Sequence, residues 1–167
     1  MNELGERRLG QGFYWQQLNQ GDRFRTFSRT ITETDLVNFI SVTGMLEELF
    51  IDAVHGGGAM GGRVVPGALT YSLIEGLLFQ SMIQGTGMAL LDVQMKALKP
   101  VRVGDTIHAF VVVSKIKPTS SGNRAIVVSD VEIRNQTDEP VMTYTVTRML
   151  AGDPAQDRAS LRAGVRA

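Results

Sequence analysis

The sequence predicts an α+β domain in which a curved antiparallel sheet wraps around one long buried helix. The segment 66–85 has the 3.6-residue period of a helix and is apolar nearly all round, which is typical of a helix buried on every side. After Gly87 the period changes to two, and runs with strand character follow one another with short turns between them. One buried helix followed by an antiparallel meander defines the α+β class.

The elements before the central helix are a short strand and a capped helix. Residues 23–30 alternate apolar and polar side chains imperfectly, as a short strand does. Thr32 can cap a helix in which Asp35 holds a capping-box position, and Gly44 is the expected C-terminal stop. Residues 45–52 predict another short turn of helix.

The central helix and the strands follow a glycine-rich loop. Residues 53–63 contain five glycines, which no regular element tolerates well, so we expect a loop there. Pro66 suits the first turn of the central helix, which is expected over about 66–84 and closed by Gly85. The expected strands are 88–98, 106–117, 125–135 and 141–150.

The chain length predicts a single domain. At 167 residues the chain is large enough to bury most of its apolar surface unaided, and it shows no internal repeat. We expect the domain over 13–150, with mobile termini at 1–12 and 151–167, because glycine, proline and polar residues interrupt both ends.

Composition excludes several classes of function. The 17 Lys and Arg residues are balanced by 17 Asp and Glu residues, so the protein has no net positive charge that would attract nucleic acid. There is no cysteine and there are only two histidines, so a metal site is not expected. No stretch reaches the roughly 18 apolar residues of a membrane helix, and the N-terminal residues lack the apolar core of a signal peptide. We therefore expect a cytoplasmic protein with no nucleic-acid or membrane partner.

Four segments resemble the MaoC-like branch of the hot-dog fold, which includes the R-specific enoyl-CoA hydratases. With their connecting spacings they cover about residues 20–150, and they are 29–44, 62–73, 99–107 and 134–136. The resemblance implies a single MaoC-like hot-dog domain that forms a homodimer or a higher hot-dog oligomer with thioester sites at the subunit interface. One curved sheet leaves an edge strand to pair and an apolar groove to cover, which agrees with such a dimer.

The family resemblance implies addition of water across the double bond of a 2-enoyl-CoA, or the reverse reaction. The coenzyme A thioester is then the substrate, and no cofactor is implied. In the family an Asp and a His five residues apart act as general acid and base in a motif G-D-x-N-P-φ-H-x-D, where φ is aliphatic. Backbone N–H groups at the N-terminus of the buried helix can stabilise charge on the thioester oxygen, and Gly67 matches that position. Ser72 matches a family serine that hydrogen-bonds within the site, although it can equally bond to its own helix backbone.

The sequence departs from the family motif at its catalytic positions. Met45 stands at the Asp position, Phe50 at the His position and the pair Glu47-Glu48 at the Asn-Pro positions, while the trailing acid remains as Asp52. Neither Met nor Phe can exchange a proton, and loss of general acid–base help costs about 10²–10⁴ in rate per group. The inherited hydratase site is therefore either inactive or rebuilt, and Met45 and Phe50 are expected to line the substrate pocket.

Several side chains are candidates for a rebuilt site. His55 can act as a relocated acid and base, oriented by Asp52 or Glu48, or it can be a solvated loop histidine. Glu47 and Glu48 can supply a carboxylate, or they can form a solvated helix face.

The glycine run 56–62 lacks the spacing of a phosphate-binding loop, so a lid over an acyl pocket is the better interpretation. His108 is expected to be an ordinary half-buried residue of a strand. The cations available for coenzyme A phosphates are Arg63, Lys96, Lys99, Arg102 and Arg134.

The leading hypothesis is a MaoC-like protein of fatty acid metabolism that binds an acyl-CoA or acyl-carrier thioester. Its activity would be that of an enoyl-CoA hydratase or 3-hydroxyacyl dehydratase, a lyase with an atypical site. Two alternatives stay open. One is a non-catalytic acyl-CoA-binding subunit of a hot-dog heteromer, and the other is a thioesterase that uses Glu47, Glu48 or Asp52 to activate water.

Overall fold

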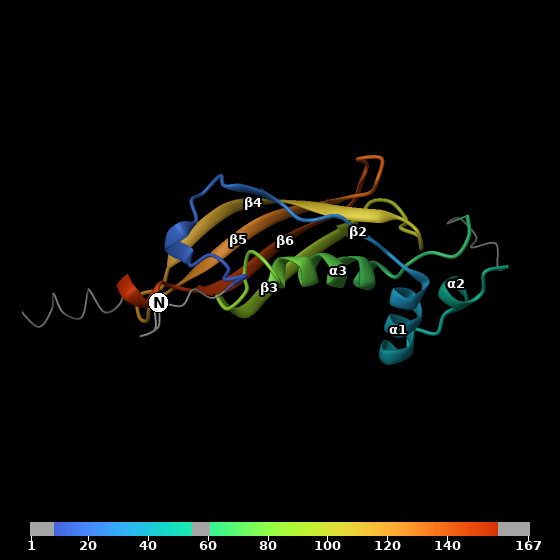
Figure 1. Ribbon diagram of the computed structural model, residues 1–167, viewed down its shortest axis with the longest axis horizontal. Helices are drawn as coiled ribbons and strands as arrows, with labels where there is room; N and C mark the ends of the chain where they lie inside the picture. The colour runs from blue at the N-terminus through green and yellow to red at the C-terminus, as the bar shows by residue number, and fades with distance from the viewer. Residues whose placement is uncertain (1–8, 55–60, 157–167) are drawn as a thin grey trace, which may run out of the picture.

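A computed structural model describes residues 9–54 and 61–156 as an antiparallel sheet curved around one central helix (Figure 1). The strands are β1 (Arg23–Arg25), β2 (Arg29–Thr30), β3 (Gly87–Ala97), β4 (Thr106–Pro118), β5 (Arg124–Arg134) and β6 (Pro140–Ala151). The helical elements are the 3₁₀ turn η1 (Trp15–Gln17), α1 (Glu33–Thr43), α2 (Glu48–Ile51) and α3 (Gly67–Phe79). The strand order is β1-β4-β5-β6-β3, with β2 also pairing with β4, and this confirms the α+β prediction.

Alternation along the strands explains the core. In β4, Ile107, Ala109 and Val111 are buried and face α3, whereas Phe110 faces the opposite side of the sheet and is exposed. The same period of two continues through β5 and β6, so every long central strand presents one apolar face to the helix. The four predicted long strands agree with the observed ones to within a residue at each end.

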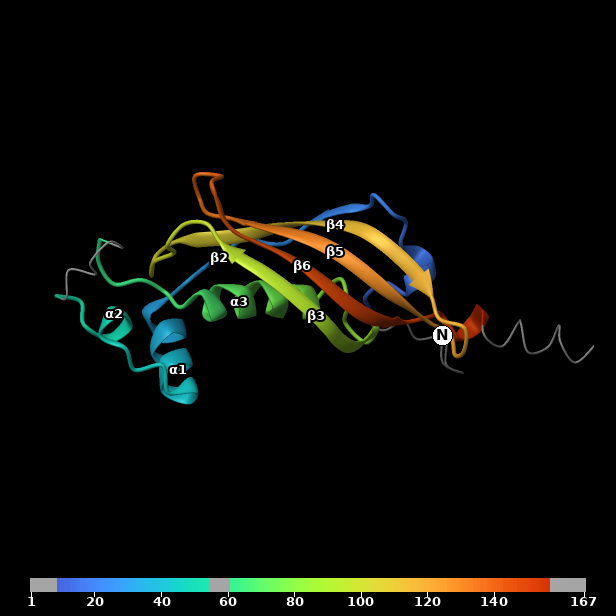
Figure 2. The ribbon, with the colours of Figure 1, turned by 180° about the vertical axis from the view of Figure 1, so that it is seen from behind.

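The central helix α3 lies across the inner face of the sheet, as both views of the ribbon show (Figures 1 and 2). Its buried side chains include Leu69, Leu73, Ile74 and Leu78. The expectation of a helix buried on every side is wrong for one flank, where Phe79 keeps 53% of its surface exposed.

The central helix is also shorter than the predicted 66–84. It ends at Phe79, and residues 80–86 form turns in which the Ile83 N–H donates to the Leu78 carbonyl at 3.1 Å. Met82 and Ile83 remain buried, so the apolar pattern continues although the helix has stopped. The chain must reverse there to enter β3 at Gly87, and a periodicity argument does not detect that reversal.

The predicted caps of α1 are confirmed. Thr32 Oγ1 accepts a hydrogen bond from the Asp35 N–H at 3.2 Å, and Asp35 Oδ2 accepts one from the Thr32 N–H at 2.9 Å. The hydrogen bond from the Thr32 N–H is the first cause that holds the pKa of Asp35 below its ordinary value. The Thr32 hydroxyl, which donates to Asp35 Oδ2 at 2.8 Å, and the charge of Arg29 lower it further. Gly44 takes the left-handed conformation that ends the helix, with φ at +72°.

The predicted strand 23–30 is interrupted between β1 and β2. At the break, Thr26 Oγ1 accepts a hydrogen bond from the Ala109 N–H at 2.9 Å, and the Thr26 N–H donates to the Ala109 carbonyl. The side-chain hydroxyl thus satisfies a backbone group of β4 that a continuous ladder would have paired.

Packed residues extend a little beyond the expected limits of 13–150. Gly12 is buried, and its N–H donates to the Gln84 carbonyl at 2.8 Å. At the other end β6 includes Ala151, and the N–H of the buried Gly152 donates to the Asn123 carbonyl at 2.7 Å. Residues 1–8 and 157–167 lie outside the described residues.

Strand β3 forms an edge of the sheet and pairs with β6. Its apolar side chains are exposed on both faces, and Met88, Leu90, Leu91 and Met95 each keep about half of their surface accessible. An exposed apolar edge strand is a template for pairing with another chain. None of the helices in 9–54 and 61–156 is both long and apolar enough to span a membrane.

Candidate functional site

A cavity of about 580 Å³ opens at the N-terminal end of α3. The helices α1 and α2 lie together beyond that end of α3, so the chain between them faces the start of the central helix (Figures 1 and 2). The lining residues come from the end of α1, from α2 and from the start of α3: Gly44, Met45, Leu46, Glu47, Phe50, Pro66, Gly67 and Ala68. The structure therefore brings together Met45, Glu47, Phe50 and Gly67.

Local backbone chemistry places these side chains. After Gly44 ends α1, a new turn begins at Glu47, whose carbonyl accepts hydrogen bonds from the Phe50 and Ile51 N–H groups at 2.8 and 3.2 Å. On the other side of the cavity the Pro66 carbonyl accepts the Leu69 N–H at 2.9 Å and so opens α3. Pro66 is the N-cap of the helix rather than a residue of its first turn.

The electrostatics of this cavity come from the helix terminus. The first N–H groups of a helix have no acceptor within it, so the start of α3 presents unpaired donors and the positive end of the helix dipole. Gly67 is exposed there, and a glycine at this point allows close approach of a ligand atom to the backbone. Such donors can stabilise an oxygen on which negative charge develops.

The side chains around this cavity are poor in groups that exchange protons. Met45 and Phe50 are apolar, and Met45 keeps 40% of its surface exposed. Among the described residues that line the cavity, Glu47 is the one titratable side chain, and it is exposed. The cavity can thus orient and polarise a carbonyl, and within its described lining Glu47 is the side chain that can exchange a proton.

The remaining predicted residues lie elsewhere. Glu48 is the first residue of α2 and Asp52 is its C-cap, and both are exposed. Asp52 Oδ1 accepts a hydrogen bond from the Val54 N–H at 2.7 Å. His55 and residues 56–60 of the glycine run lie outside the described residues, so their predicted roles stay predictions. Ser72 Oγ donates to the Ala68 carbonyl at 2.7 Å, which is the helix-backbone alternative, and Ser72 lines a second cavity.

The second cavity measures about 500 Å³ and lies between α3 and β3. Its lining is mostly apolar, with a few polar side chains: Tyr71, Ser72, Glu75, Gly76, Phe79, Ile83, Gly87, Met88, Ala89, Leu90 and Arg148. Gly67 of the first cavity and Tyr71 and Glu75 of the second follow one another at four-residue spacing along one side of α3.

A buried charged cluster in this second cavity is absent from the sequence predictions. Arg148 Nη2 donates to both carboxylate oxygens of Glu75 at 2.5 Å, and the Tyr144 hydroxyl donates to Glu75 Oε1 at 2.7 Å. A glutamate inside an otherwise apolar buried helix was the available signal, because such a charge needs a cation on the facing strand.

Burial is the main cause of the raised pKa values of the two tyrosines near this cluster. The pKa of Tyr144 is raised far above its ordinary value, first by burial and then by the negative charge of Glu75. The pKa of Tyr71 is raised for the same two reasons, and the ring of Tyr71 meets that of Tyr144 edge-on at 5.1 Å. Both hydroxyls therefore keep their protons at neutral pH, and that of Tyr144 donates to Glu75.

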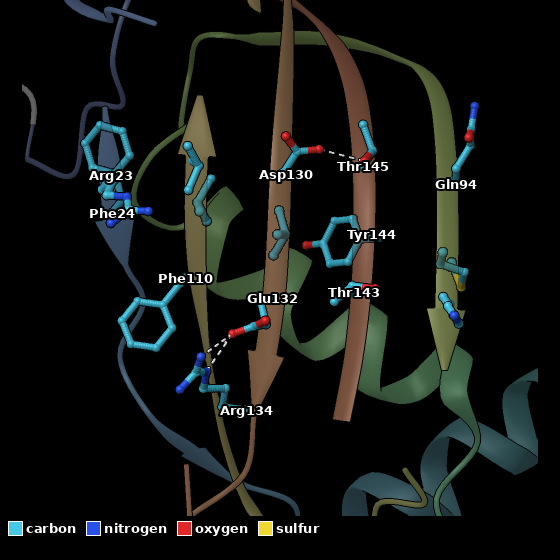
Figure 3. A pocket seen from close by; sticks show the side chains of 15 residues that line it. Arg23, Phe24, Gln94, Phe110, Asp130, Glu132, Arg134, Thr143, Tyr144 and Thr145 are labelled. Atoms are coloured by element: carbon cyan, nitrogen blue, oxygen red, sulfur yellow. Dashed lines mark hydrogen bonds and ion pairs between the residues drawn. The ribbon is translucent and has the colours of Figure 1, made fainter. Parts of the chain in front are cut away.

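A third cavity, of about 720 Å³, lies on the opposite face of the sheet from α3 (Figure 3). In that view the outward side chains of the central strands surround it, and α3 is seen behind them. Arg134 pairs with Glu132 at 2.6 Å and stacks over the Phe110 ring at 5.4 Å, while Thr145 donates to Asp130 at 2.6 Å. In these pairs the charged groups bind one another, as is usual on the outer face of a sheet, so we do not assign a site there.

His108 occupies the outer face of β4 and is buried rather than half-buried as expected. Its Nε2 lies 3.8 Å from Asp138 Oδ1, and the ring stacks edge-on against Phe110. Burial, then the positive charge of Arg25, lowers the pKa of His108 although Asp138 opposes the shift. Its place on the far side of the sheet separates it from the cavity at the start of α3.

The predicted cations do not converge on one point. Lys96 and Arg134 line the outer-face cavity, and Lys99 pairs with Glu139 at 2.6 Å. Arg63, three residues before Pro66, pairs with Glu33 at the start of α1. Arg102 Nη2 reaches the Gly61 carbonyl at 3.5 Å. Arg63 is thus the predicted cation nearest in the chain to the start of α3, and Arg102 approaches the loop before it through Gly61.

Comparison with known proteins identifies the family. The family model described as a MaoC-like domain matches residues 17–136. The protein MaoC of Klebsiella aerogenes is 31% identical over 100 residues, which are 57% of this chain and 29% of that protein. The chain therefore spans less than a third of the length of that curated relative.

Solved structures show the same fold. The R-hydratase PhaJ1 of Pseudomonas aeruginosa superposes with a TM-score of 0.71 at 22% identity, covering 85% of this chain and 88% of that one. A Mycobacterium tuberculosis protein described as a double hot-dog fold superposes at 0.78 with 19% identity, covering 88% of this chain and 46% of that one. The curved sheet and its central helix are one hot-dog unit.

Proposed function

This chain belongs to the MaoC-like dehydratase family, and we propose that it binds an acyl-CoA or acyl-carrier thioester and interconverts 2-enoyl and 3-hydroxyacyl groups. One observation carries the proposal: the cavity that joins Gly67 at the start of α3 to Met45, Glu47 and Phe50. The family resemblance assigns Met45, Glu47, Phe50 and Gly67 to the site, and the helix terminus there would supply donors for a thioester oxygen.

The proposed chemistry assigns separate roles to backbone and side chains. Backbone N–H groups of the first turn of α3 bind the thioester oxygen and stabilise the charge that accumulates on it during addition. Water loses a proton as it attacks carbon 3, and carbon 2 gains one, so at least one titratable group is needed. Met45 and Phe50 form an apolar wall that makes the cavity drier than one carrying an Asp and a His.

Two groups are proposed for the proton transfers. Glu47 lines the cavity, and a carboxylate within reach of the attacking water can act as a base. His55 is the second candidate, because a histidine with an ordinary pKa of about 6.5 is both a competent acid and a competent base at neutral pH. Asp52 and Glu48 are proposed to orient His55 rather than to meet the substrate.

A second candidate function is a non-catalytic acyl-CoA-binding subunit of a hot-dog heteromer. The observation that favours it is the pair Met45 and Phe50 in the cavity wall, where neither side chain can exchange a proton. In that case thioester binding at Gly67 would persist and the partner subunit would supply the chemistry.

The exposed edge strand supports an assembly of two copies. Met88, Leu90, Leu91 and Met95 on β3 leave an apolar edge that a second copy can pair with and cover. A homodimer is therefore part of the proposal. The similar protein described as a double hot-dog fold shows that two such units can occur in one chain.

A panel of substrates tests the proposed function. Crotonyl-CoA, longer 2-enoyl-CoAs and saturated acyl-CoAs are assayed for hydration and for release of free thiol, with wild type, Glu47→Gln and His55→Gln. We expect hydration by wild type and a fall of about 10²-fold or more in kcat, with little change in KM, for the variant that removes the acting group. Asp130→Asn, on the outer face of the sheet, is the matched control for loss of a carboxylate.

Other outcomes of this assay would favour a different function. Thiol release without hydration overturns the lyase proposal in favour of a thioesterase. Binding of acyl-CoA with neither reaction, together with co-purification of a hot-dog partner, supports the non-catalytic subunit. Failure of every thioester to bind overturns both proposed functions.

A further inference from the structure

The ion pair between Glu75 of α3 and Arg148 of β6 is the most deeply buried ion pair that we find among the described residues. The two side chains keep only about a tenth of their surface exposed, and their charged atoms meet at 2.5 Å. Tyr144 adds a hydrogen bond to the same carboxylate. The chemistry proposed at the start of α3 uses none of these three residues.

Stability does not account for such a pair. Removing two charges from water costs several kcal/mol per ion, and apolar residues of similar volume are often as good or better at the same place. Most of the other buried side chains of α3, including Ile74 and Leu78, are apolar. An apolar residue at position 75 would match most of this face, so the charged pair points to recognition.

The surroundings of the pair have the character of a small-molecule site. Glu75, Arg148 and the Tyr71 side chain line the cavity of about 500 Å³ between α3 and β3. The rest of that lining is mainly apolar and includes Phe79 and Leu90. A mostly apolar cavity with a few convergent polar groups is typical of ligand pockets.

The hydrogen-bonding capacity of these groups defines what they can bind. A guanidinium has five N–H donors, and the hydrogen bonds of Arg148 to the described residues all leave from Nη2. Tyr71 presents a protonated hydroxyl, and the carboxylate of Glu75 has room for a further donor.

The net charge of the pair is zero. A ligand carboxylate would add an uncompensated charge, whereas a hydroxyl group can accept from Arg148 or Tyr71 and donate to Glu75.

The position of the pair separates it from the reacting atoms. Glu75 comes eight residues after Gly67 on one continuous helix, which places it about 12 Å along the axis at about 1.5 Å per residue. A hydroxyl bound there is therefore not the one that the proposed lyase chemistry adds or removes. It belongs to a more distant part of the acyl chain.

On the basis of the proposed function, we infer that the cavity between α3 and β3 receives the distal acyl chain and that Glu75, Arg148 and Tyr71 select chains carrying a hydroxyl group there. Chains without such an oxygen fit the apolar lining but leave these polar groups without a ligand partner. Selectivity is then a property of the cavity and is independent of the proton transfers at the start of α3.

Binding of two matched saturated thioesters tests this inference without any turnover. Dissociation constants of octanoyl-CoA and 8-hydroxyoctanoyl-CoA are measured by calorimetry for wild type and for the double variant Glu75→Leu/Arg148→Met. Wild type should prefer the hydroxylated chain by about tenfold or more, the effect of one hydrogen bond to a charged group. The double variant should lose or invert this preference. Thr145→Val, on the outer face of the same strand, is the control.

A second variant covers the case in which the double variant does not fold. Tyr71→Phe removes one hydroxyl and keeps the ring packed against Tyr144, and it should reduce the preference severalfold. Equal binding of both thioesters by wild type overturns the inference and leaves the proposed function standing. Failure of both thioesters to bind overturns the proposed function and the inference together.

Discussion

Replacing Gly67 by alanine should separate ligand binding from folding. Gly67 is the first residue of α3, and it is exposed and lines the cavity to which the thioester is assigned. A methyl group added there would have Cε of Met142 as its nearest neighbour, at 3.5 Å. That distance is an ordinary van der Waals contact with the flexible end of a side chain, so the fold has room for the methyl group.

The expected effects on stability and binding have opposite signs. Alanine is favoured over glycine by about 0.5–1 kcal/mol in a helix interior, and by less in a first turn, so unfolding in urea should show unchanged or slightly raised stability. Binding should weaken, because the methyl group crowds the approach of the thioester oxygen to the backbone donors. Loss of one such hydrogen bond corresponds to about a tenfold rise in Kd for crotonyl-CoA.

Two measurements on the same sample check the Gly67→Ala prediction. Urea unfolding followed by circular dichroism gives the stability, and calorimetry with crotonyl-CoA gives Kd. Unchanged affinity in a stably folded variant would refute the assignment of the thioester oxygen to the start of α3. A large loss of stability would refute the reading of Gly67 as an open position.

Three further predictions concern the fold. Leu73→Ala should lower the free energy of unfolding by about 2–5 kcal/mol in a denaturant series, because Leu73 is buried under the sheet; a loss well under 1 kcal/mol would contradict that packing. Asp35→Asn should cost stability near neutral pH and progressively less as the pH falls through the lowered folded pKa of Asp35. The carboxylate contributes above its unfolded pKa of about 3.9, and a pH-independent difference would contradict the role of its bonds to Thr32. Gly152→Ala should cost about 1–3 kcal/mol in thermal unfolding, since the new Cβ would lie 1.8 Å from the Asn123 side chain; an unchanged Tm would contradict that packing.

Local chemistry made much of the fold predictable. Thr32 and Asp35 cap α1 because their side chains satisfy nearby backbone N–H groups, and Gly44 ends it because glycine tolerates a positive φ. The period of two located the long strands because one face of each is buried against α3. Each of these features depends on residues that are close together in the sequence, so a local pattern is enough to predict it.

The features that escaped prediction depend on distant parts of the chain. The helix α3 ends at Phe79 because the chain must turn into β3, although the apolar pattern continues to Ile83. Glu75 and Arg148 meet across 73 positions of sequence, and no local period reports such a pair.

The candidate site was predicted through family resemblance rather than through periodicity. The structure places Met45, Phe50 and Gly67 around one cavity. Their roles in binding and chemistry stay predictions.

The measurement that tests the central claim most directly is hydration of crotonyl-CoA by the double variant Met45→Asp/Phe50→His. The claim is that the cavity at the start of α3 is the family's thioester site with its acid–base pair replaced. If so, restoring the pair at these two positions should create hydration, or raise it above the wild-type rate, by up to about 10²–10⁴-fold per group. A double variant that folds and binds crotonyl-CoA with wild-type affinity, yet hydrates it no faster than wild type, would contradict the claim.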